Sequence, residues 1–233
     1  MTPENITFHM RIFRMQPKPI LLGFNSTVGK SGKDTLCEML NGERFAFADA
    51  LKQETAVMLG HTSVAVENLV RAAHDQKLKD QTNSDLCILS MPASDYKNFL
   101  MVRGDARMEA RSVRWHLQQY GEFRRSQDMG YWLNRTLGDI EGFMATTESF
   151  RREFIIITDV RMKNEADWVR THGGIVMRIE RDWAEPELDN KPKHISDTDL
   201  DDYGLPVIKN RCGQKEAMVA QLKEILHANR IEI

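Results

Sequence analysis

The sequence predicts an α/β fold of three layers, in which helices flank a central, mainly parallel sheet. Short apolar segments over residues 20–24 and 154–157 are typical of strands that lie buried inside such a sheet. Strand and helix signals also alternate along the chain, which is the pattern of parallel strands joined by crossover helices. Together these two observations define the expected architecture.

The fold should begin with two strand–loop–helix units. The first strand ends at a polar loop, and Asn41-Gly42 is a stop signal for the helix that follows. The second strand ends at Asp49. We expect strands over residues 20–24 and 44–48, with helices over residues 34–40 and 51–59.

The middle of the chain is polar, and turns interrupt its helical signals. Residues 61–110 should therefore form short helical pieces. A longer helix is expected over residues 111–120, with Gly121 as its end, and another over residues 131–140. We also place a mobile lid within residues 115–130, because lids that close over phosphates are commonly mobile.

The second half returns to the alternation of strands and helices. Its first strand carries four large apolar residues and ends in an acid, Asp159. Gly173-Gly174 closes the next helix, and the last helix is amphipathic. We expect strands over residues 154–159, 175–179 and 207–208, with helices over residues 164–172 and 214–229.

The composition is that of a soluble globular protein with balanced charge. The 233 residues include 32 Lys and Arg and 34 Asp and Glu, a formal net charge of −2. This balance lacks the basic excess of proteins that bind nucleic acid mainly through its phosphates. The chain also lacks a run of ~20 apolar residues that could span a bilayer. We therefore expect neither a nucleic acid nor a membrane as partner.

Three widely spaced cysteines, Cys37, Cys87 and Cys212, form neither a zinc-binding pair nor a disulfide framework. This usage fits a reducing, cytoplasmic location. Cys37 lies on the first predicted helix and should be a small core residue. We expect an N-terminal extension over residues 1–18 and one domain over residues 19–233.

A phosphate-binding loop is predicted between the first strand and the first helix. Such a loop needs glycines that let backbone N–H groups point at phosphate oxygens, a lysine that reaches the β and γ phosphates, and a helix N-terminus that favours an anion. All three features occur in Thr27-Val28-Gly29-Lys30-Ser31-Gly32-Lys33-Asp34-Thr35.

Two frames of this loop compete. In the first, Gly32-Lys33 closes the loop at the correct spacing, Thr27 replaces the usual first glycine, and Thr35 supplies a hydroxyl. In the second, Lys30 is the critical lysine, but the loop is one residue too long. We favour the first frame, so Lys33 should contact the phosphates more closely than Lys30.

Residues 31–35, Ser-Gly-Lys-Asp-Thr, resemble the phosphate-binding loop of bacteriophage deoxynucleoside monophosphate kinases and, more distantly, that of phosphomevalonate kinases. The likeness extends from about residue 20 to residue 226, with much of 61–110 unmatched. The other segments that carry it are Phe47-Ala48-Asp49-Ala50-Leu51-Lys52, Ser112-Val113-Arg114 with Gln118, Gly121 and Tyr131-Trp132, Thr158-Asp159-Val160-Arg161 with Glu165, and His194-Ile195-Ser196-Asp197 with residues 205–210.

The resemblance implies a three-layer P-loop kinase fold, with a helical acceptor and lid insertion within about residues 50–140. It also implies a Mg²⁺-dependent enzyme of nucleotide metabolism that transfers the γ-phosphoryl group of ATP to a deoxynucleoside 5′-monophosphate. Small-molecule nucleotides are then its partners, and a homodimer is left open. Such transfer needs charge neutralisation and in-line positioning more than covalent chemistry.

The resemblance also implies roles for individual residues. The catalytic group comprises Lys33, Arg114, Asp159 and Arg161. Gly29, Lys30, Ser31, Gly32, Lys33, Asp34 and Thr35 would bind ATP, and Thr35 and Asp159 would hold the metal. The acceptor would contact Asp49, Lys52, Arg111, Arg114, Gln118, Trp132 and Glu165.

Several alternatives stay open. Trp132 is either a platform for the acceptor base or a core residue, and Arg111 is either a phosphate clamp or a solvated residue. Glu122 stands where the family has Thr, so base or sugar preference can differ. The acceptor could instead be phosphomevalonate, dephospho-coenzyme A or a hydroxymethylated base in DNA. A nucleotide-binding regulator without turnover is the alternative from another functional class.

Charge is unevenly distributed along the chain. Residues 103–125 contain six arginines and three acids, whereas residues 182–202 contain eight acids and two lysines. We expect the basic segment to serve small phosphorylated substrates held in a cleft. The acidic segment is either a solvated connection or a region that repels longer polyanions.

Overall fold

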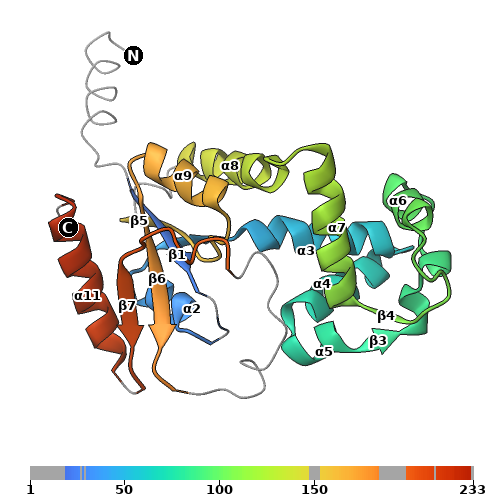
Figure 1. The fold of residues 1–233 in the computed structure, drawn as a ribbon, viewed down its shortest axis with the longest axis horizontal. Coiled ribbons are helices and arrows are strands. Elements are labelled where there is room, and N and C mark those ends of the chain that lie inside the picture. Colours follow the sequence, from blue (N-terminus) through green and yellow to red (C-terminus); the bar gives the residue numbers. More distant parts are fainter. Residues whose placement is uncertain are drawn as a thin grey trace, which may run out of the picture. The chain divides into compact units, whose positions relative to one another are not determined.

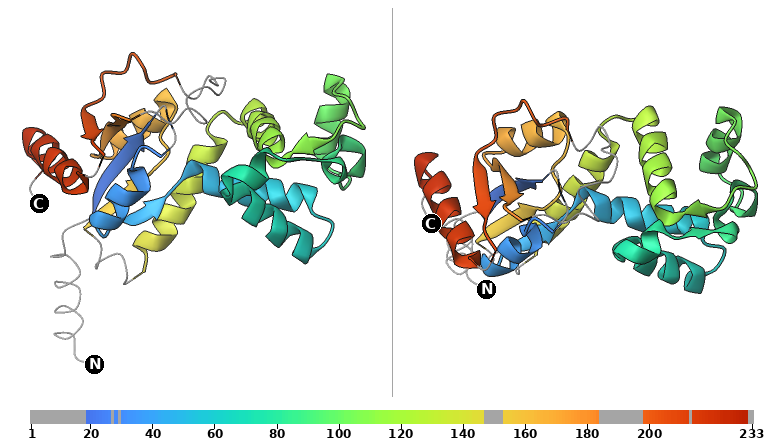
Figure 2. Two further views of the ribbon diagram at one scale, coloured as in Figure 1. Left: turned by 90° about the horizontal axis from the view of Figure 1, so that it is seen from below. Right: turned by 60° about the horizontal axis from the view of Figure 1, so that its bottom comes forward.

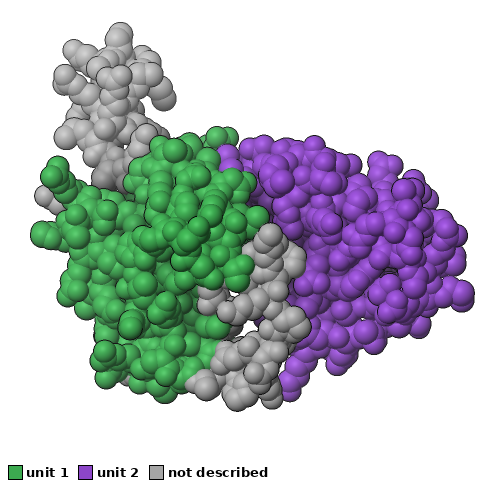
Figure 3. Space-filling model, viewed as in Figure 1, with its two compact units in different colours: residues 1–46, 139–233 green, residues 47–138 purple. Residues whose placement is uncertain are grey.

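A computed structural model describes residues 19–26, 28, 30–146, 153–183, 198–212 and 214–231. They form two units, which Figure 3 shows in green and purple. Unit 1 contains the described residues up to Ala46 and those from Asp139 onward, and unit 2 contains Phe47–Gly138. The expected N-terminal extension over residues 1–18 lies outside the described residues.

Unit 1 is built on a parallel sheet of five strands in the order β2-β5-β1-β6-β7 (Figure 1). Every neighbouring pair in this order is parallel, so the predicted α/β class with a central parallel sheet is confirmed. β1 lies in the middle, where Gly23 pairs with Ile157 on one side and Val176 on the other. The strands are β1 (Ile20–Asn25), β2 (Glu43–Phe45), β5 (Phe154–Ile157), β6 (Ile175–Arg181) and β7 (Val207–Asn210).

Helices cover both faces of this sheet (Figure 2). On one face, Leu22 and Ile156 belong to a buried cluster with residues of α2 (Lys33–Met39) and α11 (Lys215–Ala228). The cluster includes Cys37, which is 4% exposed, as well as the predicted apolar face of the last helix. The expected core position of Cys37 is therefore confirmed.

The other face packs against α9 (Lys163–Thr171). The approach is close at Gly23, where an added Cβ would lie 2.9 Å from Val160 and 3.5 Å from Val169 of α9. A larger side chain would push the helix away from the central strand. The glycine therefore lets both layers pack tightly around β1.

The second predicted strand is too long. β2 ends at Phe45, and α3 (Phe47–Leu59) begins two residues later. Phe47 and Ala50 are buried at helical spacing, and the acid Asp49 lies in the first turn, where the helix dipole favours it. Packing of this helical face overrides the β-propensity of the aromatic residue at position 47.

Unit 2 is mostly helical and has its own core. A short antiparallel pair, β3 (Thr82–Asn83) and β4 (Arg111–Ser112), accompanies the helices. The core includes Tyr96, Leu100 and Tyr120. The helices are α3, α4 (Ser63–His74), α5 (Gln76–Asp80), α6 (Asp95–Arg103), α7 (Val113–Gln127) and the first part of α8 (Tyr131–Met144).

The helix predicted over residues 111–120 is displaced. It begins after Ser112, whose Oγ accepts a hydrogen bond from the Trp115 N–H at 3.2 Å, and it continues through Gly121 to Gln127. A glycine inside a helix costs only about 1 kcal/mol relative to alanine, which the burial of Tyr120 and Phe123 outweighs. The segment where we expected a mobile lid contributes Tyr120 and Phe123 to the core of unit 2. Among the described helices, none is long and apolar enough to cross a membrane.

Candidate functional site

The predicted phosphate-binding loop connects β1 to α2, at the carboxyl end of the middle strand. In open parallel sheets, ligands bind outside the carboxyl ends of the strands. Lys30 and Gly32 both have a left-handed backbone, with φ of 55° and 99°. Thr27 and Gly29 lie outside the described residues, as do His194, Ile195, Ser196 and Asp197.

The end of β7 supports this loop. The Asn210 Nδ2 donates to the Ser31 carbonyl oxygen at 2.8 Å, and both residues are buried. A Cβ on Gly32 would lie 2.4 Å from the same nitrogen. The positive φ and the close approach of Asn210 therefore both require glycine at position 32.

Lys33 is the first residue of α2, and its Nζ donates to the Ser31 Oγ at 3.4 Å. The pKa of Lys33 is lowered to about 8, mainly by burial and also by nearby Arg161, while Asp159 and Asp34 partly offset this effect. Lys30 is exposed instead. Lys33 therefore lies within the electrostatic influence of Asp159 and Arg161, which follow β5.

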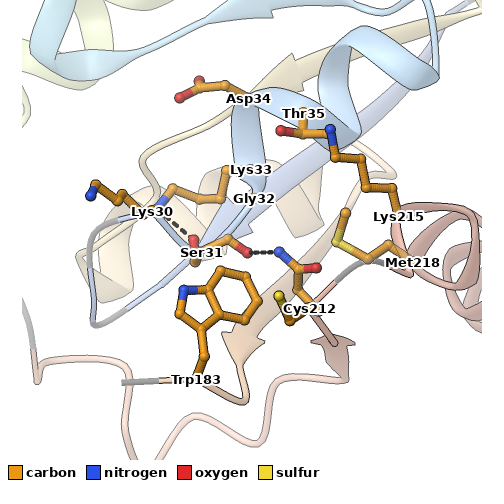
Figure 4. Close-up of a pocket in the computed structure, with 11 residues that line it drawn as sticks. Lys30, Ser31, Gly32, Lys33, Asp34, Thr35, Trp183, Cys212, Lys215 and Met218 are labelled. Carbon is orange, nitrogen blue, oxygen red and sulfur yellow. Dashed lines mark hydrogen bonds between the residues drawn. The ribbon is translucent and has the colours of Figure 1, made fainter. Parts of the chain in front are cut away.

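A pocket of about 450 Å³ opens next to the loop, within unit 1 (Figure 4). Its size is in the range of small-ligand sites. The loop and α2 supply part of the lining, and the ends of β6 and β7 and the start of α11 supply the rest. The lining residues are Lys30, Ser31, Gly32, Lys33, Asp34, Thr35, Trp183, Asn210, Cys212, Lys215 and Met218.

Five of these lining residues were not among the site residues expected from the sequence: Trp183, Asn210, Cys212, Lys215 and Met218. Trp183 and Asn210 lie at or just after the ends of β6 and β7. The carboxyl ends of parallel strands share one edge of a sheet, so the position of these two residues after predicted strands could have indicated that they lie near the loop. Met218 instead carried the signal of a core residue on an amphipathic helix.

The affinity of this loop for a phosphate ligand such as inorganic tripolyphosphate is expected to fall as pH rises above about 8. The pKa of Lys33 is lowered to about 8 in the free protein, whereas bound phosphate would favour the charged form. Binding above this pH therefore requires proton uptake, and Kd should increase by up to about tenfold per pH unit. Calorimetric titration between pH 7 and 9.5 measures this, with Lys33→Arg as the control that stays charged. A flat wild-type profile would contradict the expectation.

Asp159 and Arg161 follow β5, and Glu165 organises their segment. The Glu165 Oε2 accepts hydrogen bonds from the backbone N–H groups of Arg161 at 2.8 Å and Met162 at 3.0 Å. It thereby closes the N-terminus of α9, as a residue at the third helical position commonly does. Glu165 was expected to contact the acceptor, but in this structure it holds the backbone.

Glu165→Gln should make the stability of the protein less dependent on pH. Burial, with a contribution from Asp159, raises the pKa of Glu165 from 4.5 to about 7. Its stabilising contribution is fully present below pH 4.5 and is lost as pH rises through about 7. Gln can accept the same N–H bonds without ionising. The free energy of unfolding in urea of the variant, relative to that of wild type, should therefore increase by on the order of 2 kcal/mol from pH 4.5 to pH 7.5. Equal pH dependence of both proteins would refute this.

The arginines expected to clamp the acceptor are engaged inside unit 2. Arg114 forms an ion pair with Asp80, and its Nη2 donates to the Gln76 Oε1 at 3.1 Å. Arg111 pairs with Glu109 at 2.8 Å, and its guanidinium lies 4.3 Å from the centroid of the Trp115 ring. A phosphate that binds either arginine must therefore compete with a carboxylate.

Of the other expected acceptor residues, Asp49 accepts from Lys52 Nζ at 2.9 Å, and Gln118 is exposed on α7. Trp132 is 5% exposed, and its Nε1 donates to the Gly121 carbonyl oxygen at 3.4 Å. It packs edge-on against Tyr120 and Tyr131 in the core of unit 2. This burial argues against stacking on an acceptor base and favours the core alternative.

The uneven charge seen in the sequence is largely neutralised locally. Within 103–125, Arg103 pairs with Asp105 and Glu122, and Arg124 lies 3.6 Å from Glu54. Arg111 and Arg114 are paired as described above, so four of the six arginines have acidic partners. The basic segment is therefore a weaker argument for phosphate binding than its composition indicates. In the described part of the acidic segment, Asp201 pairs with Arg178 and Asp202 with Lys163.

The residues of unit 1 suit a Mg²⁺ ion that arrives with a nucleotide. Thr35 and Asp159 offer hard oxygen donors, which this cation prefers, and Asp159 is close enough to influence Lys33. The described residues contain no group of three or more His, Cys, Asp and Glu side chains that could hold a metal. Mg²⁺ commonly binds one or two carboxylates together with substrate phosphates and waters, so this donor set fits.

Comparison with known proteins does not assign the chain to a family. No protein-family model matches it. A search of curated proteins gave no significant match either.

Proposed function

We propose that this protein is a cytoplasmic kinase that transfers the γ-phosphoryl group of Mg²⁺-bound ATP to a deoxynucleoside 5′-monophosphate. The observation that carries the proposal is Lys33, which begins α2 in the loop pocket, with Asp159 and Arg161 in electrostatic reach. This combination of a loop lysine, an acid after a buried strand and an arginine suits phosphoryl transfer. The resemblance to bacteriophage kinases supports the choice of acceptor.

In this proposal, unit 1 binds the donor. Lys33 contacts the β and γ phosphates, and its charge offsets the negative charge on the transferring group. Arg161 can bind phosphate oxygens through its planar guanidinium. Thr35 and Asp159 would hold Mg²⁺, which supplies further charge neutralisation and orients the phosphates.

Unit 2 contributes the proposed acceptor residues Asp49, Lys52, Arg111, Arg114 and Gln118. Arg114 is the strongest of these candidates, because Ser112-Val113-Arg114 is one of the segments that resemble the kinase family. Its guanidinium is paired with Asp80 and donates to Gln76. The Asp80 carboxylate would be exchanged for the acceptor phosphate.

A coupled assay of ADP release tests the proposal. The full chain is given Mg·ATP and, in separate reactions, each of the four common deoxynucleoside monophosphates. Release that depends on one or more of these acceptors is expected. Release only with phosphomevalonate or dephospho-coenzyme A would replace the acceptor, whereas ATP binding without transfer in a single turnover would indicate a regulator.

A further inference from the structure

One wall of the pocket beside the phosphate-binding loop carries side chains that do not serve to bind phosphate. The loop supplies backbone and lysine groups, whereas Trp183 and Cys212 add an indole and a thiol. Figure 4 shows the indole of Trp183 beside Ser31, with Cys212 next to it. A ligand that fills this pocket should carry an anionic end and a flat, weakly polar end. A nucleotide has both.

The segment that carries Trp183 is fastened to the end of β7. The Asp182 N–H donates to the Asn210 carbonyl oxygen at 3.2 Å, and the Asp182 Oδ1 accepts from the Cys212 N–H at 3.3 Å. Asn210 in turn donates to Ser31. These bonds connect the tryptophan segment to the loop through one short chain of residues.

Arg181, the last residue of β6, also restrains Trp183. Its Nη1 donates to the Trp183 carbonyl oxygen, and its guanidinium carbon lies 5.9 Å from the indole centroid. The indole itself is half-buried. A rigid aromatic side chain that is already held in place binds a flat ligand at a low cost in conformational entropy.

The other three tryptophans are engaged with neighbouring side chains. Trp115 lies under the guanidinium of Arg111, Trp132 packs against Tyr131, and Trp168 stacks on His172 with centroids 4.3 Å apart. Trp183 also has an arginine near its ring, but among the four tryptophans it is the one that lines the loop pocket. It is therefore the tryptophan whose environment a ligand in this pocket would change.

We propose that Trp183 is the stacking platform for the base of the donor nucleotide, and that it favours a purine over a pyrimidine. This inference rests on the proposed function only in that the loop binds the triphosphate of a nucleotide. A purine offers a larger π-surface to the indole than a pyrimidine does. Trp183 is thus a specificity residue for the donor, next to the loop that binds its phosphates.

The test compares three ligands on the full chain: ATP, CTP and inorganic tripolyphosphate, each with Mg²⁺. Calorimetry measures their affinity for wild type, Trp183→Phe and Trp183→Ala. Trp183→Ala should lower the affinity for ATP by about tenfold to a hundredfold, and Trp183→Phe should lower it by less. The affinity for tripolyphosphate should fall by less than about twofold in Trp183→Ala. The preference for ATP over CTP should shrink in Trp183→Ala. Trp168→Phe, on the same unit, is the matched control and should bind all three ligands as wild type does.

Intrinsic fluorescence provides an independent readout. ATP should change the emission of wild type and of Trp168→Phe, but much less that of Trp183→Phe. Equal weakening of ATP and tripolyphosphate would show that Trp183 only supports the loop, and unchanged ATP affinity would place the base elsewhere. Either result overturns the inference. The coupled assay reports transfer separately, so base stacking without transfer would overturn the kinase proposal and leave this inference standing.

Discussion

Lys33→Ala is expected to lower kcat/KM for phosphoryl transfer by about 10²- to 10³-fold, which is the effect of removing one well-placed charged group from a transition state. Lys33 begins α2, lines the loop pocket and lies within the electrostatic influence of Asp159 and Arg161. Alanine removes the ammonium group but keeps a good helix former at this position. The loss should therefore appear without a large change in stability.

Lys30→Ala is the matched control, because it removes a lysine from the same loop. Lys30 is exposed and has a φ of 55°, a strained conformation that alanine and lysine share. We expect an effect within about fivefold, as for an exposed charge. Steady-state kinetics with both variants, with thermal unfolding as a check on folding, measures the difference. A larger loss in Lys30→Ala than in Lys33→Ala would show that the other loop frame is correct.

Gly32→Ala is expected to weaken ATP binding by at least about tenfold and to destabilise unit 1. A left-handed backbone costs a residue with a Cβ about 1–2 kcal/mol, and the new Cβ would lie 2.4 Å from the Asn210 Nδ2. Asn210 is buried and donates to Ser31, so it cannot move aside without breaking that bond. The loop itself must shift, which misplaces its N–H groups.

Gly173→Ala separates backbone strain from this clash. Gly173 also lies in unit 1 and has a φ of 79°, but an added Cβ would meet nothing within 4 Å. It should cost about 1 kcal/mol in the free energy of unfolding and leave the ATP affinity unchanged. Urea unfolding and calorimetric ATP titration of both variants measure the two effects. Wild-type ATP affinity in Gly32→Ala would mean that the loop conformation does not matter for binding.

The sequence predicted much of unit 1 because its signals are local. Continuous apolar runs such as residues 154–157 are typical of strands that are buried on both faces of a sheet. The loop before α2 combines glycines with a lysine at a defined spacing. Prediction was poorer where packing overrides local preference. Gly121 resembles a helix end, yet it lies inside α7 because Tyr120 and Phe123 are buried around it.

The site residues also differ in how far the sequence alone could predict their roles. Lys33 could be preferred over Lys30 from spacing alone, and residues 30–35 do line one pocket. The acceptor arginines could not be judged from the sequence, because Asp80, the partner of Arg114, is 34 positions away. For Trp132 the sequence left a ligand platform and a core residue both open, with the core favoured because an aromatic residue at helical spacing is more often core. Its burial and its neighbours support the core alternative.

The sequence by itself thus determined the strands of the central sheet and the residue types of the loop, since both depend on neighbouring residues. Only the tertiary structure decided what surrounds that loop. Asn210 is separated from Ser31 by 179 positions, and Trp183 reaches the same pocket from the end of a different strand. Parallel strands bring their carboxyl ends to one edge whatever their distance in the chain, so the wall of the pocket is a property of the sheet order rather than of any local motif.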